Sequence, residues 1–160
     1  NSLDAAAIVA RDAGVKVITL SDRLEGEARD VALKHAAMVQ AGVGGPRLYI
    51  SGGELTVTMR GNGGGGPNAE YMLALALALD SDPRIHALAI DTDGIDGSED
   101  NAGARITPDT LERARAVGLD AKVHLANNDS YGFFAGIDDL VMTGPTFTNV
   151  NDFRALLVLS

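Results

Sequence analysis

The sequence predicts an α/β protein in which a mixed β-sheet of about six strands is flanked by helices, in Rossmann-like layers. Short β-rich runs alternate with helical patterns along the chain, and glycines separate many of them. Of the 160 residues, 46% are hydrophobic and 22% are charged, which is usual for a globular protein. Aromatic residues make up only 4%, so Leu, Ala, Val and Ile must fill the core.

Three elements are predicted in the first part of the chain: a helix over 3–13, a strand over 15–20 and a helix that ends near Gly42. Gly14 lies where a helix-ending glycine is expected. Asp22 and Glu25 have the spacing of a capping box, which places the start of the second helix there. The glycine-rich segment 42–46 is the best candidate for a boundary inside the chain.

The sequence then predicts strands 47–51, 54–60, 86–91, 140–142 and about 153–159, and helices 67–80, 108–117 and a short one carrying Phe133 and Phe134. Segment 67–80 alternates Leu and Ala, which by period alone also fits a strand. Its length, its Ala and Leu content and Pro67 in the first turn favour a buried helix.

The net charge of −9 argues against nucleic acids and anionic membranes as partners, because both require a basic surface. The longest apolar run is too short to span a bilayer. The lack of Cys excludes disulfides and thiolate metal sites. No secretory signal is visible, so we expect a cytoplasmic protein. The chain begins at Asn1 directly in a helical pattern, from which we expect a segment of a longer polypeptide.

The glycine run 61–66 follows a predicted strand and precedes a predicted helix. Such a loop lets backbone N–H groups approach an anion, and the helix N-terminus adds partial positive charge. The alternative is a flexible hairpin or a linker. The run satisfies a dinucleotide spacing by its density of glycine alone, and a Walker A loop is excluded because no Gly-Lys-Ser/Thr occurs. We therefore predict a phosphate contact without assigning its type.

Asp91, Asp93 and Asp96 gather at the C-terminal end of a predicted strand, where ligands bind in α/β sheets. Carboxylates of this kind hold Mg²⁺, or one of them accepts a proton from a substrate hydroxyl. The alternative is a turn-rich surface loop. An EF-hand is rejected because Ile95 occupies a ligand position.

Two amide-rich segments, 127–130 and 149–152, flank the segment Thr-Gly-Pro-Thr at 143–146. Amides and hydroxyls bind polar ligands without adding charge, although each segment is also typical of turns and caps. The histidines are scattered, and we interpret all of them as structural or surface residues.

Five motifs together resemble the MOFRL domain of the glycerate 2-kinase family, some of whose members are labelled hydroxypyruvate reductase in tartrate utilisation. The motifs are SGGELTV (51–57), RGNGGGGPNAE (60–70), DTDGIDG (91–97), NNDSY (127–131) and TGPTFTNVND (143–152). The resemblance implies that residues 46–160 form the MOFRL domain and that residues 1–45 end a preceding, larger α/β domain.

The resemblance implies an enzyme that phosphorylates glycerate with ATP and Mg²⁺, in a cleft shared with the N-terminal domain of the same polypeptide. Catalysis would fall to Asp93, with Asn149 or Asn151 shaping the site. The metal ligands would be Asp91, Asp93 and Asp96. The residues expected to contact the cofactor are Gly61, Asn62, Gly63, Gly65, Gly66, Asn68, Thr143, Gly144 and Thr146. We expect no turnover from these 160 residues alone, and a homodimer is left open.

Many family members read GGRNQE where this chain reads GGPNAE (65–70), so Pro67 and Ala69 depart from the pattern. Pro67 cannot neutralise transition-state charge as an Arg would, which leaves the exact reaction open. The second hypothesis is therefore an NAD(P)H-dependent hydroxypyruvate reductase. Hydride transfer usually needs a general acid, often His, and this hypothesis is weakened because no His lies in a motif. The third is a non-enzymatic sensing or interface module. The substrate expected from the first two is glycerate or hydroxypyruvate.

Overall fold

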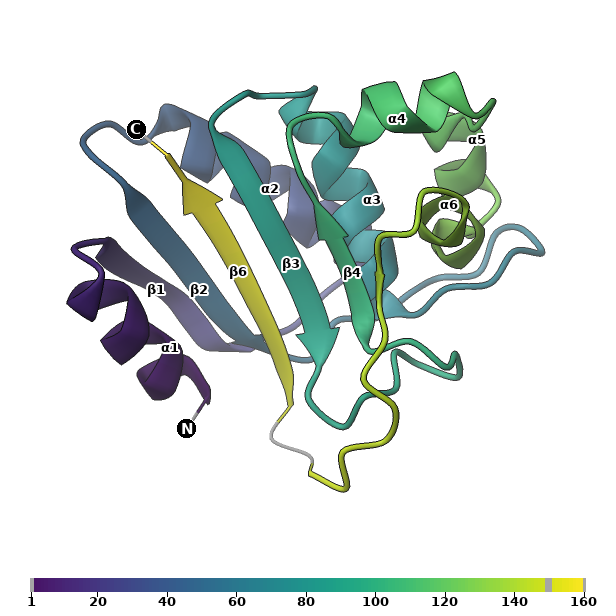
Figure 1. The fold of residues 1–160 in the computed structure, drawn as a ribbon. Coiled ribbons are helices and arrows are strands. Elements are labelled where there is room, and N and C mark those ends of the chain that lie inside the picture. The colour runs from purple at the N-terminus through teal and green to yellow at the C-terminus, as the bar shows by residue number, and fades with distance from the viewer. Residues whose placement is uncertain (1, 149–150, 160) are drawn as a thin grey trace.

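The computed structural model, which describes residues 2–148 and 151–159, has a six-stranded mixed sheet at its centre (Figure 1). The strands are β1 (Lys16–Leu24), β2 (Arg47–Gly53), β3 (Ile85–Asp91), β4 (Gly103–Ile106), β5 (Leu140–Val141) and β6 (Asp152–Val158). Their order is β1-β2-β6-β3-β4-β5, with β1 and β2 parallel and every other neighbouring pair antiparallel. The predicted fold class is confirmed.

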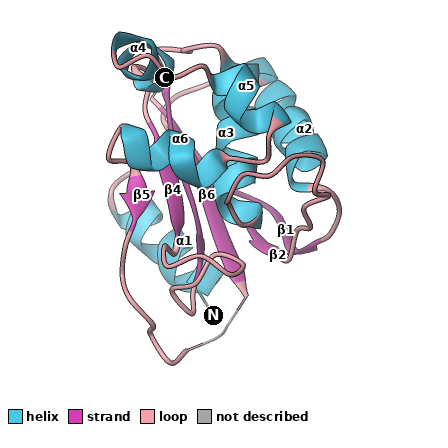
Figure 2. Ribbon diagram, turned by 90° about the vertical axis from the view of Figure 1, so that its right-hand side faces the viewer, coloured by secondary structure: helices cyan, strands magenta, loops and turns pink. Residues whose placement is uncertain are grey.

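Helices cover both faces of this sheet. They are α1 (Ser2–Asp12), α2 (Ala28–Ala41), α3 (Pro67–Leu79), α4 (Thr110–Ala116), α5 (Ala121–Ala126) and α6 (Ser130–Gly136). In Figure 1, α1 lies in front of β1 and β2, whereas α2 and α3 lie side by side behind the sheet. The shorter α4, α5 and α6 gather beside α3, toward the end of the sheet formed by β4 and β5 (Figure 1 and Figure 2).

The central element of the core is α3, which packs against α2 and against β3 and β4. Its apolar residues Tyr71–Ala76 are buried on all sides of the helix. A helix that is hydrophobic around its whole circumference has no face to offer to water. The predicted helix over 67–80 is thereby confirmed, and its Leu and Ala side chains fill much of the core.

A chain of buried polar side chains crosses this core from α2 to β6. The His35 Nδ1 atom and the Tyr71 hydroxyl are 2.6 Å apart, and the Arg154 guanidinium lies 5.7 Å from the centre of the Tyr71 ring. Burial, helped by the positive charge of Arg154, lowers the pKa of His35 to about 4. The ring is therefore neutral at pH 7, and its Nδ1 can accept a hydrogen bond from the phenol.

The capping box predicted at Asp22 and Glu25 is wrong. β1 continues to Leu24, because Ser21 and Leu24 still pair with β2 beyond the predicted end at residue 20. This pairing contains two irregularities in register. The helix α2 begins only at Ala28, and the residue before it makes no side-chain cap.

The predicted strand 54–60 is also wrong. The chain turns away from the sheet after Gly53, whose φ of 94° is left-handed, and beyond it the described backbone makes an isolated bridge between Thr56 and Glu27. The sheet still has six strands because the four-residue β4, which was not predicted, pairs with β3. The short α5 was not predicted either, and α4 begins at Thr110 rather than at residue 108.

Elements from both sides of the predicted boundary belong to this one sheet. β1 and α2, which precede residue 45, share the sheet and the core with β2 and α3. The division into segments 1–45 and 46–160 stays a prediction. Within the described residues, no helix has the length and apolar character needed to cross a membrane.

The buried His35 makes stability depend on pH. A histidine in the unfolded chain titrates near 6.5 and His35 in the fold near 4, so its contribution is complete above pH 6.5 and is lost as the pH falls toward 4. We expect the wild type to lose roughly 3 kcal/mol more unfolding free energy than His35→Gln between pH 7 and pH 4. Urea unfolding of both proteins at each pH measures this difference. The contributions of all other titrating groups cancel, because the wild type and His35→Gln have these groups in common. Equal pH slopes would contradict it.

Candidate active-site rim

The carboxyl ends of β2 and β3 and the amino end of β6 meet at one edge of the sheet, at the bottom of Figure 1. We call this edge the rim, and it consists of residues 52–53, 91–97, 143–146 and 151–152. Asp152, at the start of β6, pairs across the sheet with Asp91, at the end of β3. Because α/β proteins bind ligands beyond the carboxyl ends of their strands, the rim is the candidate site.

The acidic turn 91–97 is ordered by its own side chains. The Asp93 N–H donates to Asp91 Oδ1 (3.0 Å), and the Ile95 N–H donates to Asp93 Oδ1 (2.8 Å). Gly94 provides the left-handed φ of 88° that the turn requires. The half-buried Asp93 carboxylate is therefore held in place at the rim.

The loop 143–146 lies against this turn. Thr146 donates from its N–H to the Asp93 carbonyl (3.0 Å) and from its hydroxyl to the Thr92 carbonyl (2.6 Å). The Thr92 hydroxyl in turn donates to the carbonyl of Asn151 (2.7 Å). The structure thus brings Asp93 together with two other segments that sequence reasoning had proposed for the site.

The backbone of the glycine run 61–66 bonds to the amide-rich segment 127–129. The acceptors of its N–H groups are Asn128 Oδ1 for Gly61 (2.9 Å), Asn127 Oδ1 for Asn62 (3.0 Å), the Asn127 carbonyl for Gly63 (2.8 Å) and Asp129 Oδ1 for Gly64 (3.3 Å). Four of the N–H groups predicted to face a phosphate therefore donate within the chain.

Asp96 joins the glycine run to the acidic turn. Its fully buried carboxylate accepts hydrogen bonds from the Asn68 N–H (2.9 Å), the Asn68 side-chain amide (3.2 Å) and the Ala69 N–H (2.8 Å), while Gly66 packs against its backbone. Burial raises the pKa of Asp96 to about 6, although these donors favour the charged form. The glycine run and the acidic turn thus lie together, but the chain's own carboxylate occupies the N-terminus of α3.

Two carboxyl groups oppose each other at the rim. Burial raises the pKa of Asp91 to about 7, and the nearby charges of Asp152 and Asp93 act in the same direction. Burial also raises the pKa of Asp152, against the attraction of Arg154. A pair of this kind is stabilised by a shared proton or by a cation between the two groups.

A complete metal site is not formed by side chains alone. Among residues 2–148 and 151–159, no group of three or more His, Asp or Glu side chains is placed to hold a metal ion. Asp91 and Asp93 lie together at the rim, whereas Asp96 faces α3. Asn149, predicted to shape the site, lies outside the described residues.

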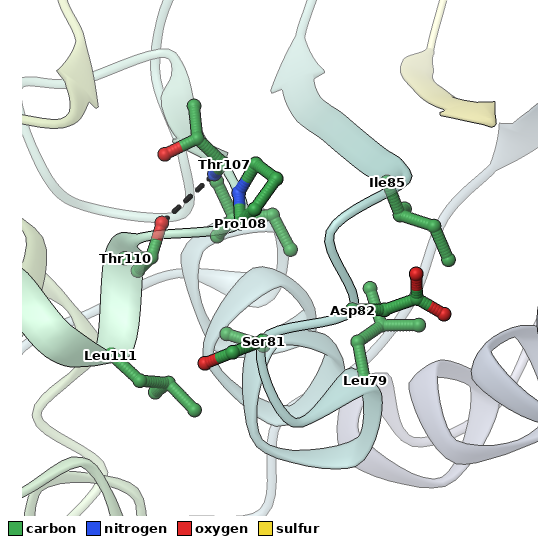
Figure 3. Close-up of a pocket in the computed structure, with 10 residues that line it drawn as sticks. Leu79, Ser81, Asp82, Ile85, Thr107, Pro108, Thr110 and Leu111 are labelled. Carbon is green, nitrogen blue, oxygen red and sulfur yellow. Dashed lines mark hydrogen bonds between the residues drawn. The ribbon is translucent and has the colours of Figure 1, made fainter. Parts of the chain in front are cut away.

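Two hollows adjoin the rim, with volumes of about 650 Å³ and 310 Å³. Both of them are lined by Asp22, Arg23, Gly53 and Asn151, and Asp152 lines the smaller one. The hollow in Figure 3, at the opposite end of the sheet, measures about 10 Å³ and has room for at most one water molecule. The rim therefore has space for a small polar ligand.

Sequence reasoning missed the buried charged residues that support the rim. Glu70 receives hydrogen bonds from Arg29 (3.0 Å) and Asn128 (2.9 Å), which ties α2 and α3 to the segment behind the glycine run. Arg154 lies under the rim beside Asp152. The two-residue period of a strand was the available signal, because it places Arg154 on the same face as Leu156 and Val158.

These features define an α/β domain with an acidic turn, hydroxyl groups and amides at the carboxyl edge of its sheet, which is the edge where α/β proteins bind ligands. The model of the MOFRL family matches residues 47–152, and the chain belongs to this family. The resemblance seen in the five motifs is confirmed.

Relatives of known name extend this result. Two Agrobacterium vitis proteins, provisionally named hydroxypyruvate reductases, are 49% and 47% identical over 98% of this chain and over 43% and 38% of their own lengths. A glycerate 2-kinase of Pyrococcus horikoshii is 38% identical over 99% of this chain and 38% of its own. The crystal structure of a Thermotoga maritima glycerate kinase matches with a TM-score of 0.92 at 34% identity, over 98% of this chain and 39% of that one. The chain thus spans about two fifths of the length of these relatives.

The close packing of the glycine run is testable with alanine. A Cβ atom on Gly63 would lie 2.6 Å from Asp129 Cα, so Gly63→Ala must displace the backbone. We expect it to lower the unfolding free energy by about 1–3 kcal/mol. Gly45→Ala is the control, because a Cβ there meets no atom within 4 Å, and its effect should stay within about 0.5 kcal/mol. Urea unfolding compares the two, and equal effects would mean that the run is loosely packed.

Proposed function

We propose that this chain forms the C-terminal part of an ATP-dependent glycerate kinase and contributes catalytic, phosphate-binding and magnesium-binding residues at a cleft between two domains. The observation that carries the proposal is the gathering of Asp93, the loop 143–146 and Asn151 at one rim beside Asp91. The names of the Pyrococcus horikoshii and Thermotoga maritima relatives support it. Phosphoryl transfer depends on positioning and charge neutralisation, which such a rim can provide.

Magnesium fits this donor set. Mg²⁺ is commonly bound by one or two carboxylates together with substrate phosphates, so a cluster of three protein ligands is not required. We assign this role to Asp91 and Asp93 rather than to Asp96, whose oxygens accept hydrogen bonds from the first turn of α3. A bound ion would neutralise phosphate charge there.

The other rim residues would orient the reacting groups. The Asp93 carboxylate is available to a substrate hydroxyl, either as proton acceptor or as orienting group. Asn151 and the hydroxyl groups of the loop 143–146 would hold polar ligand atoms without adding charge. The acidic chain leaves further cations to the N-terminal domain of the polypeptide, where the proposal places the other wall of the cleft. The glycine run contributes by holding the first turn of α3 and Asp96 against the acidic turn.

Asp93→Asn in the full-length protein tests the proposed role of this carboxylate. We expect kcat for glycerate phosphorylation to fall by about 100-fold or more, because the amide can neither accept the proton nor hold the cation. The melting temperature should change little, since the amide oxygen can still accept the Ile95 N–H. Glu112→Gln, on the exposed side of α4, is the control and should leave kcat unchanged. A kcat within threefold of the wild type for Asp93→Asn would remove this residue from the mechanism.

A hydroxypyruvate reductase is the second candidate, and the names of the two Agrobacterium vitis relatives favour it. Calorimetry of the full-length protein separates the two functions. We expect Mg·ATP to bind and NADH to give no heat, because the N–H groups of residues 61–64 that would serve a pyrophosphate donate within the chain. Binding of NADH without binding of ATP would reverse the ranking.

A further inference from the structure

Arg154 is fully buried, and among the described residues its guanidinium donates to the rim and to the strand end that leads into it. Its Nη2 atom donates to the carbonyl oxygens of Gly52 (2.9 Å) and Gly53 (2.8 Å). Its Nε atom donates to Ser51 Oγ (3.3 Å), and its Nη1 atom donates to Asp152 Oδ2 (3.4 Å). One side chain thus joins the end of β2 to the start of β6.

The burial of a guanidinium is costly unless its donors are satisfied in a fixed geometry. On the core side Arg154 lies over the face of the Tyr71 ring, and its hydrogen-bond acceptors come from the strand ends. Gly52 and Gly53 line the 310 Å³ hollow, and Gly53 also lines the 650 Å³ hollow. Arg154 therefore fixes the floor of the space in which a rim ligand would lie.

We propose that Arg154 is a positioning residue that shapes the site of the small hydroxy-acid substrate, a role that rests on the proposed kinase function. Asp22, Arg23 and Asn151 line both hollows; the Arg23 guanidinium suits a carboxylate, and the Asp22 carboxylate can accept hydrogen bonds from hydroxyl groups. The nucleotide is assigned to the other side of the rim, at the acidic turn and the loop 143–146. A lysine cannot replace Arg154, because a single ammonium group cannot reproduce the planar fork that reaches both strand ends.

The chain provides a matched control in Arg47. This residue is also buried, and its guanidinium also binds backbone carbonyls, including those of Gly42 (2.6 Å) and Gly44 (3.2 Å). It lies at the beginning of β2, at the end of the sheet away from the rim. Arg47→Lys therefore removes an equivalent buried guanidinium group that does not line either hollow.

The experiment compares Arg154→Lys with Arg47→Lys in the full-length protein, by steady-state kinetics and by hydrogen exchange of the backbone. We expect Arg154→Lys to raise KM for glycerate about tenfold while KM for ATP stays within about twofold, and to speed exchange at residues 52–55. Arg47→Lys should leave both KM values unchanged and speed exchange only near residues 42–47. A fall in melting temperature in both variants is expected and does not separate them.

The inference is overturned if the two variants shift KM for glycerate equally, or if exchange at residues 52–55 is the same in Arg154→Lys and the wild type. If Arg154→Lys does not fold, Ser51→Ala provides the second test. It removes only the acceptor of the Arg154 Nε atom and should raise KM for glycerate about threefold. An unchanged KM in Ser51→Ala then counts against the inference. If the wild type phosphorylates no glycerate, the kinase proposal fails, and hydrogen exchange still decides whether Arg154 holds the rim.

Discussion

The first turn of α3 must find its hydrogen-bond acceptors inside the protein, and the rest of the site depends on this constraint. Because α3 is buried on all sides, water cannot satisfy the N–H groups at its start. Asp96 provides the acceptors. This forces the acidic turn after β3 to lie against residues 66–69, where only a glycine such as Gly66 leaves room for its backbone. The core therefore determines where the functional carboxylates lie.

A second buried polar cluster holds the glycine run from the other side. Asn128 accepts the N–H groups of Arg60 and Gly61 through its Oδ1 and donates to Glu70, which also pairs with Arg29. This geometry depends on several polar residues whose hydrogen bonds are made within the chain. A family motif can thus mark buried support for a site as well as the site itself.

Elements governed by local composition could be predicted from the sequence, and elements governed by distant partners could not. α3 follows from its length and its Ala and Leu content. The run 54–60 has strand-like residues but no neighbouring strand to pair with after the turn at Gly53, so pattern alone misassigned it. The capping box failed because residues 21–24 pair with β2 across a long sequence separation.

The candidate site was predictable as a set of segments, but not at the level of individual side chains. The glycine run and the loop 143–146 both lie against the acidic turn, although the glycine run does not follow a strand of the sheet. Asp96 points inward because it accepts hydrogen bonds from Asn68 and Ala69, which are distant in sequence, and no sequence pattern specifies these partners. Asp96 therefore seemed equivalent to Asp91 and Asp93 until its partners were known.

The position of β6 has a consequence for biosynthesis. β6 follows β5 in sequence order, yet it lies in the middle of the sheet, between β2 and β3. While a ribosome still holds these residues, the nascent polypeptide has two unjoined half-sheets whose inner edges are open to wrong partners. The sheet can therefore become continuous only after β6 has been synthesised and has left the ribosome.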